Sequence, residues 1–350
     1  MAVFGDGNTQ NGYRLPKSSC RPGPILIMAG GLSLLIVAII VSFFQGIVQV
    51  SVSAAGAALL HFDANSVQHL IMRDLRLPRI LSSVVTGAAL AVAGALMQGI
   101  TRNPMADSGL LGLNAGAAFA LSLCFTFYPG TSPAFIMLSS FLGAAVSAGM
   151  VYGIASWPRG GATPLRLVLA GAAVSAALTA LGQGIAIYFG VARDILFWLT
   201  GGVAGVSWQQ LHILLPWVAI ALLAAIMLSR SVSVLSLGSE VAQGLGLRSR
   251  LVSGSAALVV LILAGVSVAM IGPVSFIGLI VPHLCRHLLG GDYRLIIPAS
   301  AILGSLILVV ADIGARLLNP DFEIPIGALT ALLGAPFFLY IARRQQRRAV

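Results

Sequence analysis

The stretch ILSSVVTGAALAVAGALMQGIT, residues 80–101, decides the fold, because it runs for 22 residues without an aspartate, glutamate, lysine or arginine. A transmembrane helix needs about 20 such residues to cross the hydrocarbon core of a bilayer. Six more charge-free runs lie at residues 22–62, 108–158, 167–192, 195–229, 251–285 and 295–311. Backbone inside lipid must satisfy its own hydrogen bonds, so runs of this kind form helices. The chain is therefore predicted to be an all-α integral membrane protein.

The composition agrees with this prediction. Hydrophobic residues make up 58% of the chain and charged residues 9%, and forty glycines suit helices that pack closely through small residues. The net charge of +10 is scattered over short loops, which favours a role in membrane topology and excludes a nucleic-acid-binding surface. Cys20, Cys124 and Cys285 are far apart and lack metal-ligand spacing, so we expect neither a disulfide framework, nor a metal site, nor a cofactor.

We predict about ten membrane spans in a single transmembrane domain, residues 24–345, which follows an N-terminal tail, residues 1–23. The predicted spans are residues 25–44, 80–100, 110–127, 135–156, 167–189, 211–229, 251–270, 274–289, 295–316 and 326–341. With both termini in the cytoplasm, fifteen of the twenty basic residues lie on the cytoplasmic side and five lie outside. The positive-inside rule favours this orientation.

The second and seventh predicted spans share a short internal sequence match. Arg79-Ile-Leu-Ser82 aligns with Arg250-Leu-Val-Ser253, and Ala93-Gly94 aligns with Ala264-Gly265 without a gap. The two copies enter the membrane from opposite sides, which is the pattern of an inverted-topology repeat. Chance matching of small residues in apolar segments is the alternative explanation.

The sequence contains few residues of the kinds that a nucleotide-binding, metal-binding or ion-coupling site would need. A phosphate-binding P-loop requires a lysine, and the single lysine, Lys17, lies in the polar tail, so the chain is not expected to hydrolyse ATP or to be an enzyme. His283 and His287 share a helical face and could hold a metal, although solvated loop histidines are the more common case. The spans also lack the buried carboxylates of an ion-coupled carrier, because Asp312 is spaced to pair with Arg316.

Two surfaces are candidates for binding partners. Arg73, Arg76 and Arg79 lie on the predicted outer face, where they suit an anionic partner or, alternatively, lipid headgroups, and Pro78 is expected to mark the start of the helix. The segment 237–248 reads as a short helix with a serine cap, with Glu240 in its first turn and glycines at its end. It is either a docking helix for a soluble partner or a polar connector.

An ordered series of motifs resembles the FecCD-type permeases, the membrane subunits of importers for ferric siderophores, haem and cobalamin. The motifs are Arg76-Leu-Pro-Arg79, Gly94-Ala-Leu-Met-Gln98-Gly, Arg102-Asn-Pro-Met-Ala-Asp-Ser-Gly-Leu-Leu-Gly112, Gly201-Gly202 before Trp208, Ser275-Phe-Ile-Gly-Leu-Ile-Val-Pro-His283, Ala311-Asp312-Ile-Gly-Ala-Arg316, Glu323-Ile-Pro-Ile-Gly327 and Leu333-Gly-Ala-Pro-Phe337. The resemblance runs from about residue 60 to the C-terminus. It implies a type II importer permease with ten spans per subunit in the cytoplasmic membrane.

The resemblance also implies partners and site residues. The partners are two cytoplasmic ATPase subunits, an extracytoplasmic substrate-binding protein, membrane lipids and a second permease, as a homodimer or a heterodimer. Arg76, Arg79 and Arg316 match arginines that receive acidic residues of the binding protein. The segment Ser239, Glu240, Val241, Ala242, Gln243, Gly244 and Gly246 matches the helix that contacts the ATPase, and Thr163, Pro164 and Arg166 fall at the cytoplasmic gate.

The expected function is import of an iron–siderophore complex, driven by ATP hydrolysis in a separate subunit. Haem or cobalamin import within the same family is the nearest alternative. An ion-coupled secondary carrier is the alternative from a different class, and the scarcity of buried carboxylates weighs against it.

Overall fold

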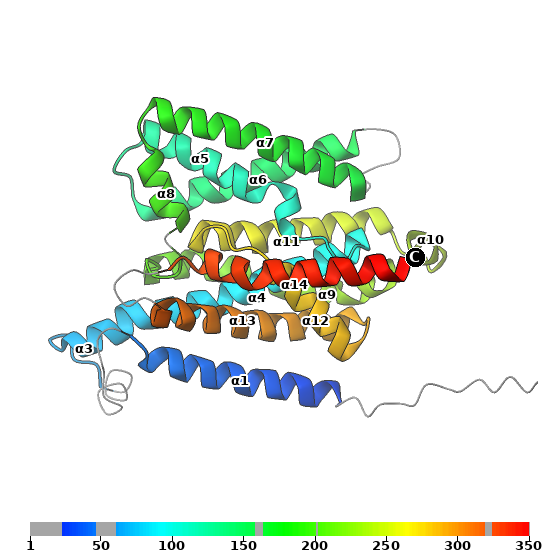
Figure 1. Ribbon diagram of the computed structural model, residues 1–350, viewed down its shortest axis with the longest axis horizontal. Helices are drawn as coiled ribbons and strands as arrows, with labels where there is room; N and C mark the ends of the chain where they lie inside the picture. Colours follow the sequence, from blue (N-terminus) through cyan, green and yellow to red (C-terminus); the bar gives the residue numbers. More distant parts are fainter. Residues whose placement is uncertain (1–22, 47–60, 158–163, 201, 319–323, 350) are drawn as a thin grey trace, which may run out of the picture.

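The computed structural model describes residues 23–46, 61–157, 164–200, 202–318 and 324–349 (Figure 1). The regular structure of these residues is entirely helical. The elements are α1 (Pro24–Phe44), α3 (Val67–Leu70), η1 (Ile71–Arg76), α4 (Leu77–Thr101), η2 (Ser108–Leu111), α5 (Leu113–Phe127), α6 (Pro133–Ser156), α7 (Pro164–Tyr188), α8 (Ala192–Thr200), α9 (Trp208–Ser236), α10 (Ser239–Gly244), α11 (Ser249–Ile271), α12 (Ile277–Leu289), α13 (Tyr293–Leu318) and α14 (Ile326–Ala349).

Seven of these helices are long and apolar enough to cross a membrane, counting α3, η1 and α4 as one continuous helix. Three shorter apolar segments, in α5, α12 and α14, occupy the positions of the remaining predicted spans. The all-α membrane fold predicted from the charge-free runs is confirmed. The short helix α8 was not predicted, because its nine residues fall between two expected spans.

The central element of the bundle is α4, which lies among α9, α11, α12 and α13 (Figure 1). Every residue from 86 to 99 of this helix is buried. Glycines make this possible: a Cβ atom on Gly87 would collide with the carbonyl oxygen of Gly304 on α13, and one on Gly94 would collide with that of Gly278 on α12. Close backbone approach through small residues is the packing that helices use inside membranes. The two copies of the internal sequence match lie on α4 and α11, which pack against each other.

The expected helix start at Pro78 is wrong. The helix begins at Val67 and passes through the π-helical turn η1 before α4. Proline lacks the N–H that would bond one turn back, and the wider π-turn ahead of it accommodates its ring without ending the helix. Arg73 and Arg76 therefore lie on helix rather than in a loop.

Two helices are too short to cross a bilayer by themselves. The 15 residues of α5 and the 13 of α12 span about 22 Å and about 20 Å, against about 30 Å of hydrocarbon. Each follows a non-helical or 3₁₀ segment that turns sharply: Gly112 before α5 has φ +68°, and Phe276 before α12 has φ +70°. Both residues adopt the left-handed conformation, which glycine reaches without strain and a phenylalanine rarely adopts.

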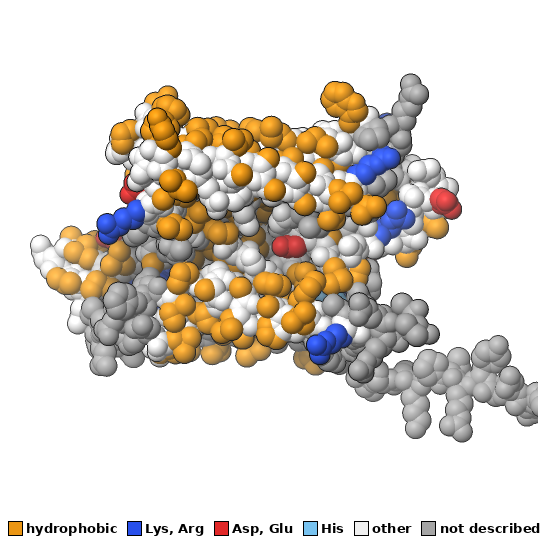
Figure 2. All heavy atoms as spheres, turned by 45° about the horizontal axis from the view of Figure 1, so that its top comes forward, with side chains coloured by type: hydrophobic (Ala, Val, Ile, Leu, Met, Phe, Trp, Pro, Cys, Tyr) orange, Lys and Arg blue, Asp and Glu red, His pale blue; other side chains and the backbone are white. Residues whose placement is uncertain are grey.

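The bundle has two distinct ends. The start of α1, the end of α14 and the helix α10 lie together at one end, here named the α10 end, while α3 lies at the opposite end, here named the arginine end (Figure 1). Orange hydrophobic side chains cover much of the face between them, and most of the blue and red charged side chains lie toward the two ends (Figure 2). This distribution suits a protein that is surrounded by lipid along its middle.

Candidate functional site

At the arginine end, one buried carboxylate joins α4 to α13. The Asp312 side chain is 1% exposed. Its Oδ1 accepts hydrogen bonds from Nε and Nη2 of Arg79, at 2.9 and 2.8 Å, and its Oδ2 accepts one from Nη2 of Arg316 at 2.8 Å. The pairing of Asp312 with Arg316, four residues apart on one helix, confirms the spacing argument. Arg79 lies 233 residues away in sequence, and no local pattern predicted its contact with Asp312.

The same arginines hold the end of α1. Nη1 of Arg316 donates to the carbonyl oxygens of Ser42 and Gln45, at 3.1 and 2.7 Å, and Nη1 of Arg76 donates to that of Phe43 at 2.7 Å. The last carbonyls of a helix lack partners within the helix, and the guanidinium groups supply donors to them. The three arginines matched to docking residues, Arg76, Arg79 and Arg316, are thus brought together around Asp312 and the end of α1. Each is largely buried, with Arg76 only 6% exposed.

A hollow of about 760 Å³ opens beside this cluster, between η1 and α9. Phe62, Arg73, Trp208 and His212 line it, together with Asp74. The guanidinium carbon of Arg73 lies 4.4 Å from the centre of the Phe62 ring, and the indole N–H of Trp208 donates to the carbonyl of Arg73 at 2.8 Å. Arg73 is therefore held by aromatic neighbours, unlike the arginines that contact Asp312 or the end of α1.

At the α10 end, the short helix α10 projects from the bundle between α9 and α11 (Figure 1). Ala242 is buried against the bundle, whereas Glu240, Val241, Gln243, Gly244 and Gly246 are exposed and Ser239 is half-buried. The first turn contains Glu240, and Gly246 with φ +79° follows the end of the helix, as predicted. The predicted serine cap is wrong: Gly238 precedes the helix and no side chain caps it.

A polar network connects the last part of α9, at the α10 end, with the core. The hydroxyl of Ser233, near the end of α9, donates to Asp292 at 3.0 Å and accepts the N–H of Tyr293 at 2.8 Å. The Tyr293 hydroxyl in turn accepts from Arg286 on α12. Arg286 also donates to the side-chain oxygen of Gln98 on α4. The Gln98 amide nitrogen then donates to two carbonyls in the first turn of α12, at 3.2 and 3.3 Å.

Comparison with known proteins identifies the family. The model of the FecCD transport family matches residues 34–344. The chain belongs to the FecCD transport family. It is 47% identical to the iron(3+)-hydroxamate import system permease protein FhuB of Bacillus subtilis, over 93% of this chain and 85% of that protein. It is 37% identical to the ferric enterobactin transport system permease protein FepD of Escherichia coli, over 92% of this chain and 96% of that protein.

A solved structure shares the fold of this FecCD-family chain. It is described as an ABC transporter of the metal-chelate type in an inward-facing conformation. The superposition has a TM-score of 0.81 with 29% identity, and it covers 91% of this chain and 99% of that one. The fold of this chain is therefore that of the membrane-spanning subunit of an ABC transporter.

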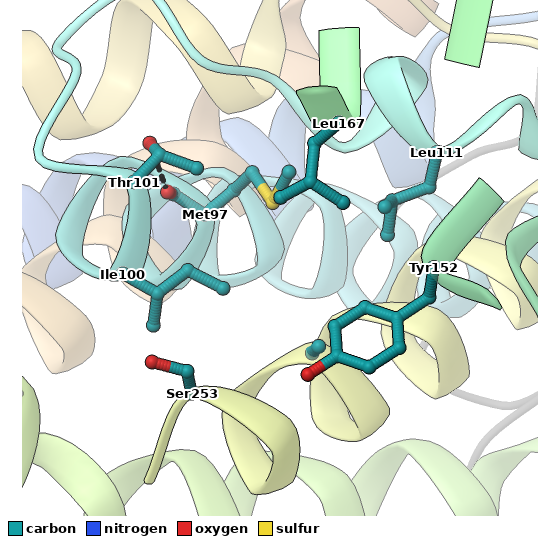
Figure 3. Close-up of a pocket in the computed structure, with 8 residues that line it drawn as sticks. Met97, Ile100, Thr101, Leu111, Tyr152, Leu167 and Ser253 are labelled. Atoms are coloured by element: carbon teal, nitrogen blue, oxygen red, sulfur yellow. Dashed lines mark hydrogen bonds between the residues drawn. The ribbon is translucent and has the colours of Figure 1, made fainter. Parts of the chain in front are cut away.

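The gate residues expected from the FecCD resemblance fall at the start of α7. Thr163 lies outside the described residues, Pro164 is the first residue of α7, and Arg166 is half-buried in its first turn. Close by, a hollow of about 70 Å³ is lined by residues of α4, η2, α6, α7 and α11, among them Met97, Tyr152, Leu167 and Ser253 (Figure 3). Pockets that hold small molecules measure about 300–1,000 Å³, so this hollow does not accommodate a metal chelate.

The loop of the Arg102–Gly112 motif contains a further acidic group. The Asp107 carboxylate lies against Gly278 in the first turn of α12. Burial raises the pKa of Asp107 above its ordinary value, while the N–H groups of Ser108 and Gly109 and the Ser108 hydroxyl lower it. In the sequence Asp107 stands out only as part of a motif, because its contact with α12 depends on the tertiary fold.

The histidine pair does not form a metal site with its described neighbours. The rings of His283 and His287 lie 5.3 Å apart on one face of α12, and His283 also contacts the ring of Phe337. Within the described part of the chain, no group of three His, Cys, Asp or Glu side chains is arranged to hold a metal ion.

Proposed function

We propose that this chain is the permease subunit of an ABC importer that moves an iron–siderophore complex across the cytoplasmic membrane, with ferric hydroxamates as the leading substrate class. The observation that carries this proposal is the 47% identity with the iron(3+)-hydroxamate permease FhuB over nearly the whole chain. A second relative, 46% identical over 79% of this chain, is named a probable siderophore transport permease, YfiZ of Bacillus subtilis. Haem and cobalamin complexes are the second candidates.

In this proposal the α10 end faces the cytoplasm and binds ATPase subunits. Support comes from the shape of α10, which is anchored by buried Ala242 and presents Glu240 and Val241 outward. Val241 is 49% exposed. An exposed apolar side chain beside a carboxylate on a projecting helix is more typical of a surface that binds a protein partner than of a segment that only connects two spans. The chain itself is not proposed to hydrolyse ATP, because its single lysine lies at position 17.

The arginine end then faces outward and receives the substrate-binding protein through Arg76, Arg79 and Arg316. The meeting of three guanidinium groups beside Asp312 and the end of α1 supports this assignment, because positive charge steers acidic partners. The path itself is proposed to run between two copies of this chain, or between this chain and a similar permease, with Thr163, Pro164 and Arg166 at its inner gate.

Uptake of radioactive iron tests the proposal. The chain would be produced together with the ATPase and the binding protein of an iron–hydroxamate importer, in cells that lack their own hydroxamate permease. We expect uptake of a ferric trihydroxamate that persists when proton and sodium gradients are collapsed and stops when ATP is depleted. Ferric citrate, haem and cobalamin serve as competing substrates. Uptake by the purified chain alone, driven by an ion gradient, would instead support the secondary carrier.

A further inference from the structure

The hollow between η1 and α9 contains two charges that lack an ionic partner in the described part of the chain. Arg73 and Asp74 both line it, and both are exposed. Neighbouring residues on a helix do not face each other, so the two groups point in different directions. The Arg73 guanidinium lies over the Phe62 ring, and neither Arg73 nor Asp74 takes part in a described ion pair. The hollow therefore presents a positive and a negative charge that stand apart.

The remaining lining of the hollow is apolar and aromatic. Leu70 and Leu77 line one side, and Trp208 and His212 of α9 line the other, with their rings 5.9 Å apart. Trp208 is the first residue of α9, and its indole N–H is held by the carbonyl of Arg73. A tryptophan at the end of a membrane helix is typical of the membrane–water interface, where its ring lies at the level of the lipid headgroups. These residues place the hollow at headgroup depth.

An apolar stripe leads from the hollow along α9. Three, seven, eleven and fourteen residues beyond His212, the same face of the helix carries exposed apolar side chains, which are Leu215, Ala219, Leu223 and Ile226. The helix is long and apolar enough to cross a membrane, so this stripe suits contact with hydrocarbon. A ligand whose charged part fills the hollow can therefore lay an apolar chain along α9.

We propose that the hollow binds one phosphatidylethanolamine molecule, with its phosphate on Arg73, its ammonium group on Asp74 and an acyl chain along the stripe of α9. Guanidinium N–H groups suit phosphate oxygens, and a carboxylate accepts hydrogen bonds from an ammonium group. A lipid with a negative headgroup, such as phosphatidylglycerol, pairs with Arg73 but offers Asp74 no cation. An acidic segment of a protein partner has the same mismatch, so a zwitterionic lipid fits best.

The proposed site divides the arginines of this end between two tasks. Arg76, Arg79 and Arg316 contact the end of α1 or Asp312, whereas Arg73 faces the hollow. The lipid site depends neither on the transported substrate nor on the partners proposed above, because it uses only residues of α3, η1, α4 and α9 and the segment before them. Failure of the lipid site would leave the proposed transport function unaffected.

Native mass spectrometry tests the site with the full chain, delipidated in detergent and titrated with phosphatidylethanolamine or phosphatidylglycerol. Wild type should bind its first phosphatidylethanolamine more tightly than its first phosphatidylglycerol. Arg73→Gln should weaken phosphatidylethanolamine binding about fivefold, which is the contribution of one arginine near a lipid surface. Asp74→Asn should remove the preference between the two lipids. Equal binding of both lipids by wild type overturns the proposal.

The chain contains a matched control for these changes. Arg193-Asp194 at the start of α8 repeats the dipeptide, is exposed and lies at the same end of the bundle, but it does not line the hollow (Figure 1). Arg193→Gln and Asp194→Asn should bind both lipids as wild type does. If they change lipid binding as much as the variants of Arg73 and Asp74, any exposed charge at this end acts alike and the proposal fails.

A further variant fills the hollow and keeps both of its charges. Ala64 lines the hollow and is exposed, so Ala64→Trp should fold normally and occupy the space of the headgroup. We expect loss of the preference for phosphatidylethanolamine, and a preference that persists in the folded variant overturns the proposal. Binding of a hexaglutamate peptide identifies the other possible occupant. If Arg73→Gln loses hexaglutamate but keeps phosphatidylethanolamine, the hollow binds an acidic protein segment and the lipid assignment is wrong.

Discussion

The two ends of α4 carry polar clusters that are built on different principles. At the arginine end, Arg79 and Arg316 surround one carboxylate, Asp312, whose side chain is 1% exposed. At the α10 end, Arg286 is held by neutral groups, the amide of Gln98 and the hydroxyl of Tyr293. Buried opposite charges depend strongly on each other, since removing one leaves the other uncompensated, whereas neutral hydrogen bonds are individually modest. We therefore expect the arginine end to be the more rigid of the two and the α10 end to be easier to rearrange.

The largest effect on unfolding is expected for Asp312→Leu. Two buried guanidinium groups lose their carboxylate, which costs about 3–5 kcal/mol. Unfolding of the purified chain in detergent, followed by circular dichroism, measures the loss. Asp292→Leu is the control, because Asp292 directly precedes α13 at the α10 end, where its carboxylate accepts only from the Ser233 hydroxyl and the Arg294 N–H among the described contacts. Equal loss in the two variants would contradict the difference between the ends.

An intermediate effect is expected for Gln98→Leu. The change removes the acceptor of Arg286 and the donor to the carbonyls of Gly278 and Leu279, in a side chain that is buried. The expected cost is about 1–3 kcal/mol, since buried groups are left unsatisfied. Gln98→Glu is the informative companion, because it offers Arg286 a carboxylate and imitates the arginine end. If Gln98→Leu destabilises as much as Asp312→Leu, ionic and neutral clusters do not differ as we describe.

A smaller effect is expected for Ser233→Ala. The hydroxyl links α9 to the start of α13, but Asp292 is exposed and can bond to water instead. The loss should be about 1 kcal/mol, the value of one ordinary hydrogen bond. Ser305→Ala provides a comparison in the core, where the hydroxyl donates to the carbonyl of Val84 at 2.7 Å. A larger loss for Ser233→Ala than for Ser305→Ala would mean that the α10 end is not the more adaptable region.

The smallest effect on unfolding is expected for Glu240→Arg, within about 0.5 kcal/mol, because the side chain is exposed on α10. Its effect on transport should nevertheless be large, and Gly246→Trp should act in the same way. Both variants should insert normally, lose iron uptake and retain less ATPase on purification. Lys17→Ala is the matched control and should leave uptake intact. Normal ATPase retention in both α10 variants would rule out this surface as the docking site.

Sequence reasoning succeeded where the signal was local. The charge-free runs predicted the membrane helices, and the spacing of Asp312 and Arg316 predicted an ion pair within one turn. Local reasoning failed at Pro78, because a π-helical turn ahead of the proline continues the helix. It failed again at the cap of α10, where Gly238 occupies the position expected for a serine. In both cases the backbone adopts a conformation that is less common than the one the local residue pattern predicts.

The sequence by itself determined that the chain is helical and lies in a membrane, because hydrophobicity and the need to satisfy backbone hydrogen bonds leave no other structure in lipid. It also determined the family, through motifs that follow one another in order. Only the tertiary structure decided that Arg79 shares the carboxylate of Asp312 and that Gln98 shares the guanidinium of Arg286. Such contacts join residues far apart in the chain, and they depend on the depth at which α4 meets α12 and α13. Close contacts of Gly87 with Gly304 and of Gly94 with Gly278 set that depth. The chain contains many glycines, and its sequence alone does not show which of them meet.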